Sequence, residues 1–131
     1  MTTLRQQRGQ DGEDIAARHL ETLGYRLIAR NWRPNRKDGP GGIRGEVDII
    51  AWHGKTLCFV EVKARSSDRF GAPQEAVTAA KQRQISRLAN AYLALQRIDD
   101  VPCRFDVVEV WLVPGAAPSV KLHQNAFDYQ G

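Results

Sequence analysis

The sequence is poor in the residues that bind zinc or build disulfide frameworks. It has two cysteines and three histidines among 131 residues. Cys58 and Cys103 lie in separate apolar runs without a Cys-x-x-Cys spacing, so neither a zinc site nor a disulfide framework is expected. The histidines are scattered, which gives no support to a histidine metal site or a Ser-His-Asp arrangement. A reducing cytoplasm is the simplest setting for such a chain.

Long apolar segments are also missing. No run approaches the roughly 20 residues needed to span a bilayer, and the polar stretch 1–10 has no apolar core of an export signal. Neither the phosphate-binding pattern GxxxxGK nor the dinucleotide-binding pattern GxGxxG occurs. We therefore expect a cytoplasmic protein with no membrane partner.

The size and composition are those of one ordinary globular domain, expected to cover residues 1–131. The hydrophobic fraction is 42% and the charged fraction 26%. Nineteen Lys and Arg against fifteen Asp and Glu give a charge of +4, which is compatible with a polyanionic partner without being diagnostic of one. A homodimer is left open by the sequence.

Basic residues cluster in the ranges 30–44 and 65–87. These clusters predict either a surface that contacts nucleic acid or two solvated loops and a helix face. The candidate contact residues are Arg33, Arg36, Lys37, Arg44, Arg65 and Lys81.

Hydrophobic periodicity predicts a mixed α/β fold with the order α-β-β-β-α-β-β. Gly24 suits the left-handed cap of the first helix, Pro73 suits the start of the second, and Pro34 to Arg44 reads as a mobile basic loop. The expected helices cover 12–23 and 73–95, and the expected strands cover 25–31, 46–51, 56–64, 105–113 and a short edge strand at 119–123. A sheet of about five strands flanked by two main helices follows from that order.

The hairpin formed by the second and third strands brings acidic residues together. If Gly54-Lys55 is a two-residue turn, the numbers of cross-strand partners add up to 109. Asp48 then lies opposite Glu61, and Glu46 lies opposite Lys63. Paired Cβ atoms in such a ladder are roughly 4.5 to 5.5 Å apart, so two carboxylates can share one hard cation.

This arrangement suits the cleavage of phosphodiester bonds. A magnesium ion held by Asp48 and Glu61 would polarise a phosphate oxygen and lower the pKa of a bound water. Lys63 points the same way as Glu61 and could stabilise the charge that develops on the phosphate, and the carbonyl of Val62 is a further candidate ligand. The alternative is an ordinary solvated strand, with Glu46 and Lys63 forming an exposed ion pair of little energetic value.

Several motifs spread over nearly the whole chain resemble those of the YraN-like family of small bacterial proteins. That family is similar to the PD-(D/E)XK nuclease superfamily and, in its core, to archaeal Holliday-junction resolvases. The motifs are Gly12-Glu13-Asp14, Leu23-Gly24-Tyr25, Arg30-Asn31-Trp32-Arg33, Gly45-Glu46-Val47-Asp48, Phe59-Val60-Glu61-Val62-Lys63 and Phe105-Asp106-Val107-Val108.

The resemblance implies a restriction-endonuclease-like fold with Mg²⁺ or Mn²⁺ as cofactor. Asp48 and Glu61 would be metal ligands, and Lys63 would be the catalytic lysine. Glu13 matches the acidic residue of the first helix that assists the metal site in related nucleases, although an acid in a first helical turn also favours the helix dipole. Lys81 matches a basic residue of the family's second helix, and a solvated helix lysine is the alternative.

The sequence departs from the family pattern at two places. Val47 replaces the proline of the superfamily motif, and the segment 34–42 is longer than the corresponding loop.

The motifs, the acidic pair and the basic clusters together predict a metal-dependent endonuclease that acts on DNA. Branched or damaged DNA in repair or recombination is the expected substrate. A nucleic-acid-binding module without catalysis and a structural interaction subunit are the alternatives.

Overall fold

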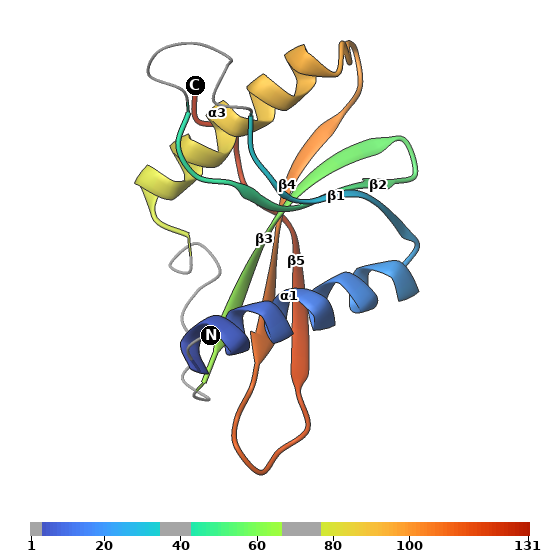
Figure 1. The fold of residues 1–131 in the computed structure, drawn as a ribbon. Helices are drawn as coiled ribbons and strands as arrows, with labels where there is room; N and C mark the ends of the chain where they lie inside the picture. Colours follow the sequence, from blue (N-terminus) through green and yellow to red (C-terminus); the bar gives the residue numbers. More distant parts are fainter. Residues whose placement is uncertain (1–3, 35–42, 67–76) are drawn as a thin grey trace.

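A computed structural model describes residues 4–34, 43–66 and 77–131, except for the side chains of residues 4–6 and 8. Two helices and five strands form in the described residues (Figure 1). The helices are α1 (Leu4–Thr22) and α3 (Ala79–Leu95). The strands are β1 (Tyr25–Trp32), β2 (Val47–His53), β3 (Thr56–Arg65), β4 (Cys103–Trp111) and β5 (Ser119–Phe127).

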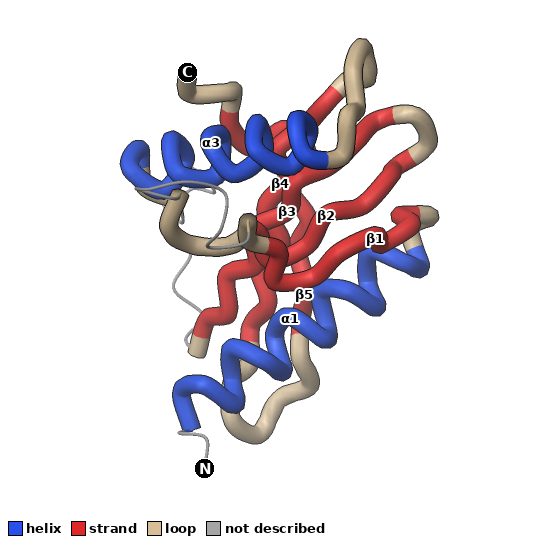
Figure 2. Tube along the Cα trace, turned by 45° about the horizontal axis from the view of Figure 1, so that its top comes forward, coloured by secondary structure: helices blue, strands red, loops and turns tan. Residues whose placement is uncertain are grey.

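The strands form one mixed sheet in the order β1-β2-β3-β4-β5. Only β3 and β4 are parallel, because α3 lies between them in the chain, while the other neighbouring strands are antiparallel. The tube view shows α3 above the sheet and α1 below it (Figure 2). The predicted fold class, a mixed sheet of about five strands flanked by two helices, is therefore confirmed.

Each face of the sheet has its own apolar core. Phe59 packs with Leu88 and Tyr92 on the side of α3, and Val60 packs with Ala16 and Leu20 on the side of α1. Alternate residues of a strand point to opposite faces, so the continuous apolar runs of β3 and β4 serve both cores. The prediction that β4 is a central strand buried on both faces is confirmed.

The hairpin register is the predicted one. Gly54 adopts a φ of +61° in the turn between β2 and β3. The pairs Ile49 with Val60 and His53 with Thr56 both have numbers that add up to 109. Asp48 and Glu61 stand one position beyond the Ile49 pair, where the backbone N–H of Val62 donates to the Asp48 side chain.

Some element boundaries differ from the prediction. Helix α1 begins eight residues before Gly12, because polar helix-forming residues extend it without an apolar stripe. Helix α3 begins at Ala79 with Thr78 as N-cap, rather than at Pro73, which lies outside the described residues. Strand β5 continues to Phe127 through an irregularity at Asn125, whose φ is +52°.

Gly12 allows α1 to approach β3 closely. A Cβ atom built at Gly12 would lie 3.0 Å from the Cβ of Ala64. A larger residue at this position would push the first half of α1 away from the sheet. The next residue, Glu13, is thereby held near the acidic end of the β2–β3 hairpin.

Neither described helix is long and apolar enough to cross a membrane. The thiols of Cys58 and Cys103 are both free, the first buried and the second exposed.

Candidate active site

Asp48, near the start of β2, and Glu61, in the middle of β3, form a partly buried acidic pair. The backbone N–H of Val62 donates to Oδ2 of Asp48 at 2.8 Å, which fixes that carboxyl group against the neighbouring strand. Burial raises the pKa of Asp48 and that of Glu61, and the negative charge of Asp48 raises the pKa of Glu61 further. The two groups therefore resist carrying two negative charges together.

Lys81 supplies a positive charge beside this pair. Its Nζ lies 3.7 Å from Oε1 of Glu61, whose side chain is 13% exposed. The positive charge of Lys81 lowers the pKa of both Asp48 and Glu61, in opposition to burial. The first turn of α3 thus brings Lys81 to the acidic pair, so this lysine is not merely a solvated helix residue.

The other oxygen of Glu61 is unsatisfied. Oε2 is buried and has no hydrogen-bond partner among the residues that the structure describes. A buried carboxylate oxygen without a partner costs free energy, which a cation can recover. This orphan oxygen beside Asp48 is the observation that fits a divalent metal.

The donors present suit a small hard cation. Magnesium is held in proteins by one or two carboxylates together with waters and substrate phosphates, and Asp48 and Glu61 are two such carboxylates. In the described part of the chain, no three His, Cys, Asp or Glu side chains gather closely enough to hold an ion. The acidic pair can therefore hold Mg²⁺ or Mn²⁺ only with oxygen ligands from elsewhere, such as the Val62 carbonyl, water or phosphate.

Glu13 lies beside the pair, held by a neighbouring amide. Its negative charge raises the pKa of Asp48, while its own carboxylate accepts from Nδ2 of Asn31 at 3.1 and 3.3 Å. The same nitrogen donates to Oε1 of Glu46 at 3.2 Å. Asn31 is in the left-handed region, with φ +50°, at the end of β1.

Glu46 does not form the predicted pair with Lys63. It precedes β2, and its carboxylate accepts from Asn31 instead. Lys63 follows Glu61 by two residues on β3 and is exposed. Its participation in the chemistry stays a prediction.

The other predicted contact residues are spread around this region. Arg33 and Arg44 are exposed, whereas Arg36 and Lys37 lie outside the described residues. The carbonyl of Arg44 accepts from Nε2 of Gln84 at 2.8 Å, which ties the segment before β2 to α3. Nε of Arg65 donates to Oε2 of Glu109 at 2.5 Å.

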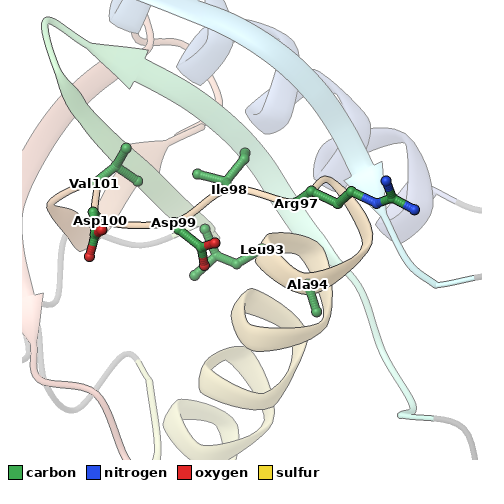
Figure 3. Close-up of a pocket in the computed structure, with 7 residues that line it drawn as sticks. All are labelled: Leu93, Ala94, Arg97, Ile98, Asp99, Asp100 and Val101. Carbon is green, nitrogen blue, oxygen red and sulfur yellow. The ribbon is translucent and has the colours of Figure 1, made fainter.

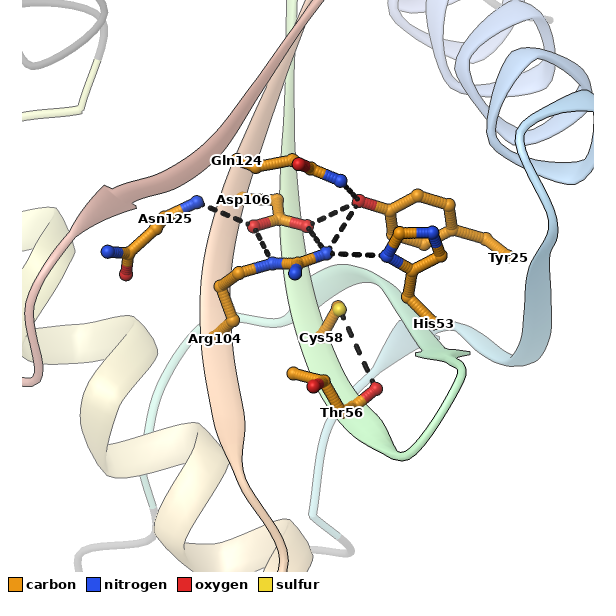
Figure 4. Close-up of polar contacts among 8 residues, drawn as sticks. All are labelled: Tyr25, His53, Thr56, Cys58, Arg104, Asp106, Gln124 and Asn125. Atoms are coloured by element: carbon orange, nitrogen blue, oxygen red, sulfur yellow. Dashed lines mark hydrogen bonds and ion pairs between the residues drawn. The ribbon is translucent and has the colours of Figure 1, made fainter.

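A second polar cluster lies on the opposite face of the sheet from the acidic pair (Figure 4). Asp106 is fully buried and accepts hydrogen bonds from Arg104, from the Tyr25 hydroxyl and from the backbone N–H of Asn125. The Tyr25 hydroxyl also accepts from Gln124. Because these polar atoms satisfy one another, the cluster is structural.

A hollow of about 630 Å³ lies beyond the C-terminal end of α3 (Figure 3). Its charged side chains are Arg97, Asp99 and Asp100, with apolar residues between them. It shares no residue with the acidic pair.

Sequence reasoning missed the role of Asn31 and the pairing of Lys81 with Glu61. A polar residue at a strand end that tolerates positive φ was the available signal for Asn31. No sequence signal indicated the contact of Lys81, because it depends on how α3 packs across the sheet.

The fold and the site are those of a mixed α/β protein with a partly buried acidic pair at the open end of a β-hairpin. A model described as uncharacterised protein family UPF0102 matches residues 12–110. The chain belongs to this family, the YraN family that its motifs resemble.

Similar proteins cover most of the chain. UPF0102 protein STH1475 of Symbiobacterium thermophilum is 50% identical over 119 residues, which are 91% of this chain and 94% of that protein. UPF0102 protein GSU0650 of Geobacter sulfurreducens is 48% identical over 92% of this chain and 88% of its own length. UPF0102 protein CT2262 of Chlorobaculum tepidum is 50% identical over 78% of this chain and 73% of its own length. These matches establish the family, and the chemistry is inferred from the site.

Proposed function

We propose that this protein is a Mg²⁺- or Mn²⁺-dependent endonuclease that hydrolyses phosphodiester bonds in DNA in the cytoplasm. The observation that supports this proposal most strongly is the Asp48–Glu61 pair, in which Oε2 of Glu61 is buried without a hydrogen-bond partner in the described residues. Two carboxylates buried together without sufficient counter-charge are unfavourable unless a bound cation or a proton compensates them. The resemblance to the PD-(D/E)XK nucleases supplies the reaction type.

Asp48 and Glu61 would hold the metal, with the Val62 carbonyl as a third oxygen donor. The bound ion would polarise a phosphate oxygen and lower the pKa of a water. Glu13 would assist the metal site, with both of its carboxylate oxygens oriented by the amide of Asn31. Lys63 would stabilise negative charge on the phosphate, and the exposed Arg33 and Arg44 would contact the backbone of the substrate.

One observation favours a second candidate function, a nucleic-acid-binding module without catalysis. The ammonium of Lys81 lies 3.7 Å from Glu61 and partly neutralises the acidic pair without a metal. If this ion pair is permanent, Lys81 blocks the metal rather than assisting it. A structural interaction subunit would likewise need no metal.

The decisive experiment is a cleavage screen with purified protein. Duplex, flap, junction and single-stranded DNA are incubated with Mg²⁺ or Mn²⁺, with EDTA as the negative control. The proposal expects cleavage that needs the metal and is abolished in Asp48→Asn and in Glu61→Gln, both of which keep the size of the side chain. Metal-independent nicking that persists in both variants would show a contaminating nuclease, and no cleavage of any substrate with either metal would favour the binding module.

A further inference from the structure

The face of the sheet that contains Glu61 carries a row of charged residues across three strands. Lys63 on β3 pairs with Glu109 on β4, and Glu109 pairs with Lys121 on β5. Directly paired residues in neighbouring strands share a face of the sheet. Lys63 and Lys121 therefore flank Glu109, and both lysines are exposed whereas Glu109 is buried.

Glu109 holds two further basic side chains on this face. Nε of Arg65 donates to its Oε2 at 2.5 Å, and Nε2 of His123 lies 2.7 Å from its Oε1. The Glu109 side chain is only 3% exposed, so its charge is directed inward. The terminal nitrogens of Arg65 have no hydrogen-bond partner in the described part of the chain.

The charges on this face beyond the acidic pair do not cancel. Lys63, Arg65 and Lys121 contribute three positive charges there against the single negative charge of Glu109. Lysines on an edge strand such as β5 can simply prevent edge-to-edge aggregation. That role needs no buried carboxylate that fixes an arginine and a histidine beside them.

We propose that four basic residues form a phosphate-contact surface for the DNA substrate: Lys63, Arg65, Lys121 and His123. Lys121 is the outermost residue of this surface. Glu109 is the positioning residue for Arg65 and His123. This inference rests on the proposed function, because it makes the surface the place where the substrate backbone leaves the acidic pair. Glu61 precedes Lys63 by two residues and pairs with Val107, which pairs with His123. The proposed surface therefore begins two residues beyond Glu61 on β3 and extends across β4 to the edge strand β5.

The dimensions suit a nucleic-acid backbone. Two strand spacings separate Lys63 from Lys121, which is roughly 10 Å at about 4.8 Å for each spacing. The axial rise of duplex DNA is about 3.4 Å for each base pair, so this span corresponds to about three base-pair steps along the helix axis.

The test measures binding without cleavage. Fluorescence anisotropy of labelled duplex DNA is recorded over a salt series, with Asp48→Asn as the parent protein and magnesium omitted. Lys121→Ala is expected to lower the slope of log affinity against log salt by roughly 0.9. Lys55→Ala is the matched control, because Lys55 is an exposed lysine in the β2–β3 turn at the other end of the hairpin, and its slope should equal that of the parent.

The proposed phosphate-contact surface would be overturned if the slope of log affinity against log salt were equal for the Lys121 and Lys55 variants. It would also be overturned if the parent protein bound no DNA. A loss of polyglutamate binding as large as the loss of DNA binding would also overturn it and would assign Lys121 to an acidic protein partner. Circular dichroism of both variants shows whether each is folded before it is compared. Failure of the cleavage screen is a separate outcome, because the anisotropy measurement requires no turnover.

Discussion

The side-chain amide of Asn31 donates to both carboxylate oxygens of Glu13, with Nδ2 at 3.1 Å from Oε2 and 3.3 Å from Oε1. Asn31 ends β1, and Glu13 lies in the middle of α1, so this contact joins the helix to the sheet beside Asp48. The left-handed backbone at Asn31 directs the amide toward the helix. Asn31 therefore determines where the Glu13 carboxylate lies.

Replacement of Asn31 should weaken metal binding without unfolding the protein. Loss of a residue that orients a metal site from outside the ligand shell typically costs about 10- to 100-fold in affinity or activity. Asn31→Gly and Asn31→Ala both remove the amide, but glycine tolerates positive φ and alanine does not. We expect both variants to lose Mn²⁺ affinity to a similar extent, as measured by calorimetry. Asn31→Ala should in addition be less stable to unfolding than Asn31→Gly by about 1 kcal/mol. Unchanged affinity in Asn31→Gly would remove Asn31 from the site.

The acidic pair should make the metal-free protein less stable as the pH rises. Asp48 and Glu61 have pKa values in the folded protein above those of the unfolded chain, which are near 4. As the pH rises, these carboxyl groups lose their protons in the unfolded chain before they do so in the folded protein. Their contribution to stability is therefore complete below about pH 4 and is lost as the pH rises through their pKa values in the folded protein. Thermal melts in EDTA between pH 4 and pH 8 measure this loss.

The Glu61→Gln variant should remove most of that dependence. We expect it to be more stable than wild type at pH 8 by on the order of 1 to 3 kcal/mol, and similar to wild type at pH 4. Asp99→Asn, at an exposed position far from the pair, is the control and should follow wild type. Mg²⁺ should stabilise the wild-type protein at pH 8 but should not stabilise Glu61→Gln. If stability changed with pH in the same way in both proteins, the raised pKa values of the acidic pair would be contradicted.

A comparison of Lys63 with Lys55 separates an effect of a lysine on the cleavage step from its effect on DNA binding. Both are exposed lysines of the same hairpin region, but only Lys63 follows the acidic pair on β3. Lys63→Ala should slow single-turnover cleavage about a hundredfold, equivalent to about 3 kcal/mol, because it removes an electrostatic group from the reacting centre. Affinity for DNA should fall only by the amount expected for one phosphate contact. Cleavage by Lys63→Ala at the wild-type rate would remove its catalytic assignment, and Lys55→Ala should match wild type in both measurements.

The polar cluster around Asp106 should matter for stability and not for cleavage. The Tyr25 hydroxyl donates to Asp106 at 2.9 Å and accepts from Arg104 and Gln124, so Tyr25→Phe removes three hydrogen bonds from the cluster. The expected cost is about 1 to 3 kcal/mol in urea unfolding. His53, which stacks on Tyr25, is five residues along β2 from Asp48, or about 17 Å. A cleavage rate that fell in proportion to the lost stability would mean that the Asp106 cluster and the acidic pair are energetically coupled.

The sequence allowed the hairpin and its acidic pair to be predicted because a two-residue turn fixes the register. Once Gly54-Lys55 is recognised, the position of Asp48 opposite Glu61 follows from counting. The order of the elements and the central place of β4 followed from periodicity. These are local properties, which a single sequence contains.

Contacts between distant segments could not be predicted in this way. Lys81 reaches Glu61 only because α3 crosses the sheet at a particular angle, and Asn31 reaches Glu13 only because Gly12 lets α1 approach β3. The predicted pair of Glu46 with Lys63 failed because β2 begins at Val47, which leaves Glu46 free to turn toward Asn31. Packing geometry, rather than residue type, decides each of these contacts.

The parallel pairing of β3 with β4 has a consequence for how quickly the protein folds. Leu57 pairs with Cys103, 46 residues later (103 − 57), whereas the β2–β3 hairpin closes between His53 and Thr56. Local hairpins form in about 1 to 10 μs, but pairing of segments distant in sequence must first overcome the entropy of closing a long loop. We therefore expect the docking of β4 to limit the folding rate. The two carboxylates would meet early in that process, and Glu109 would reach its basic neighbours only with the last strands of the sheet.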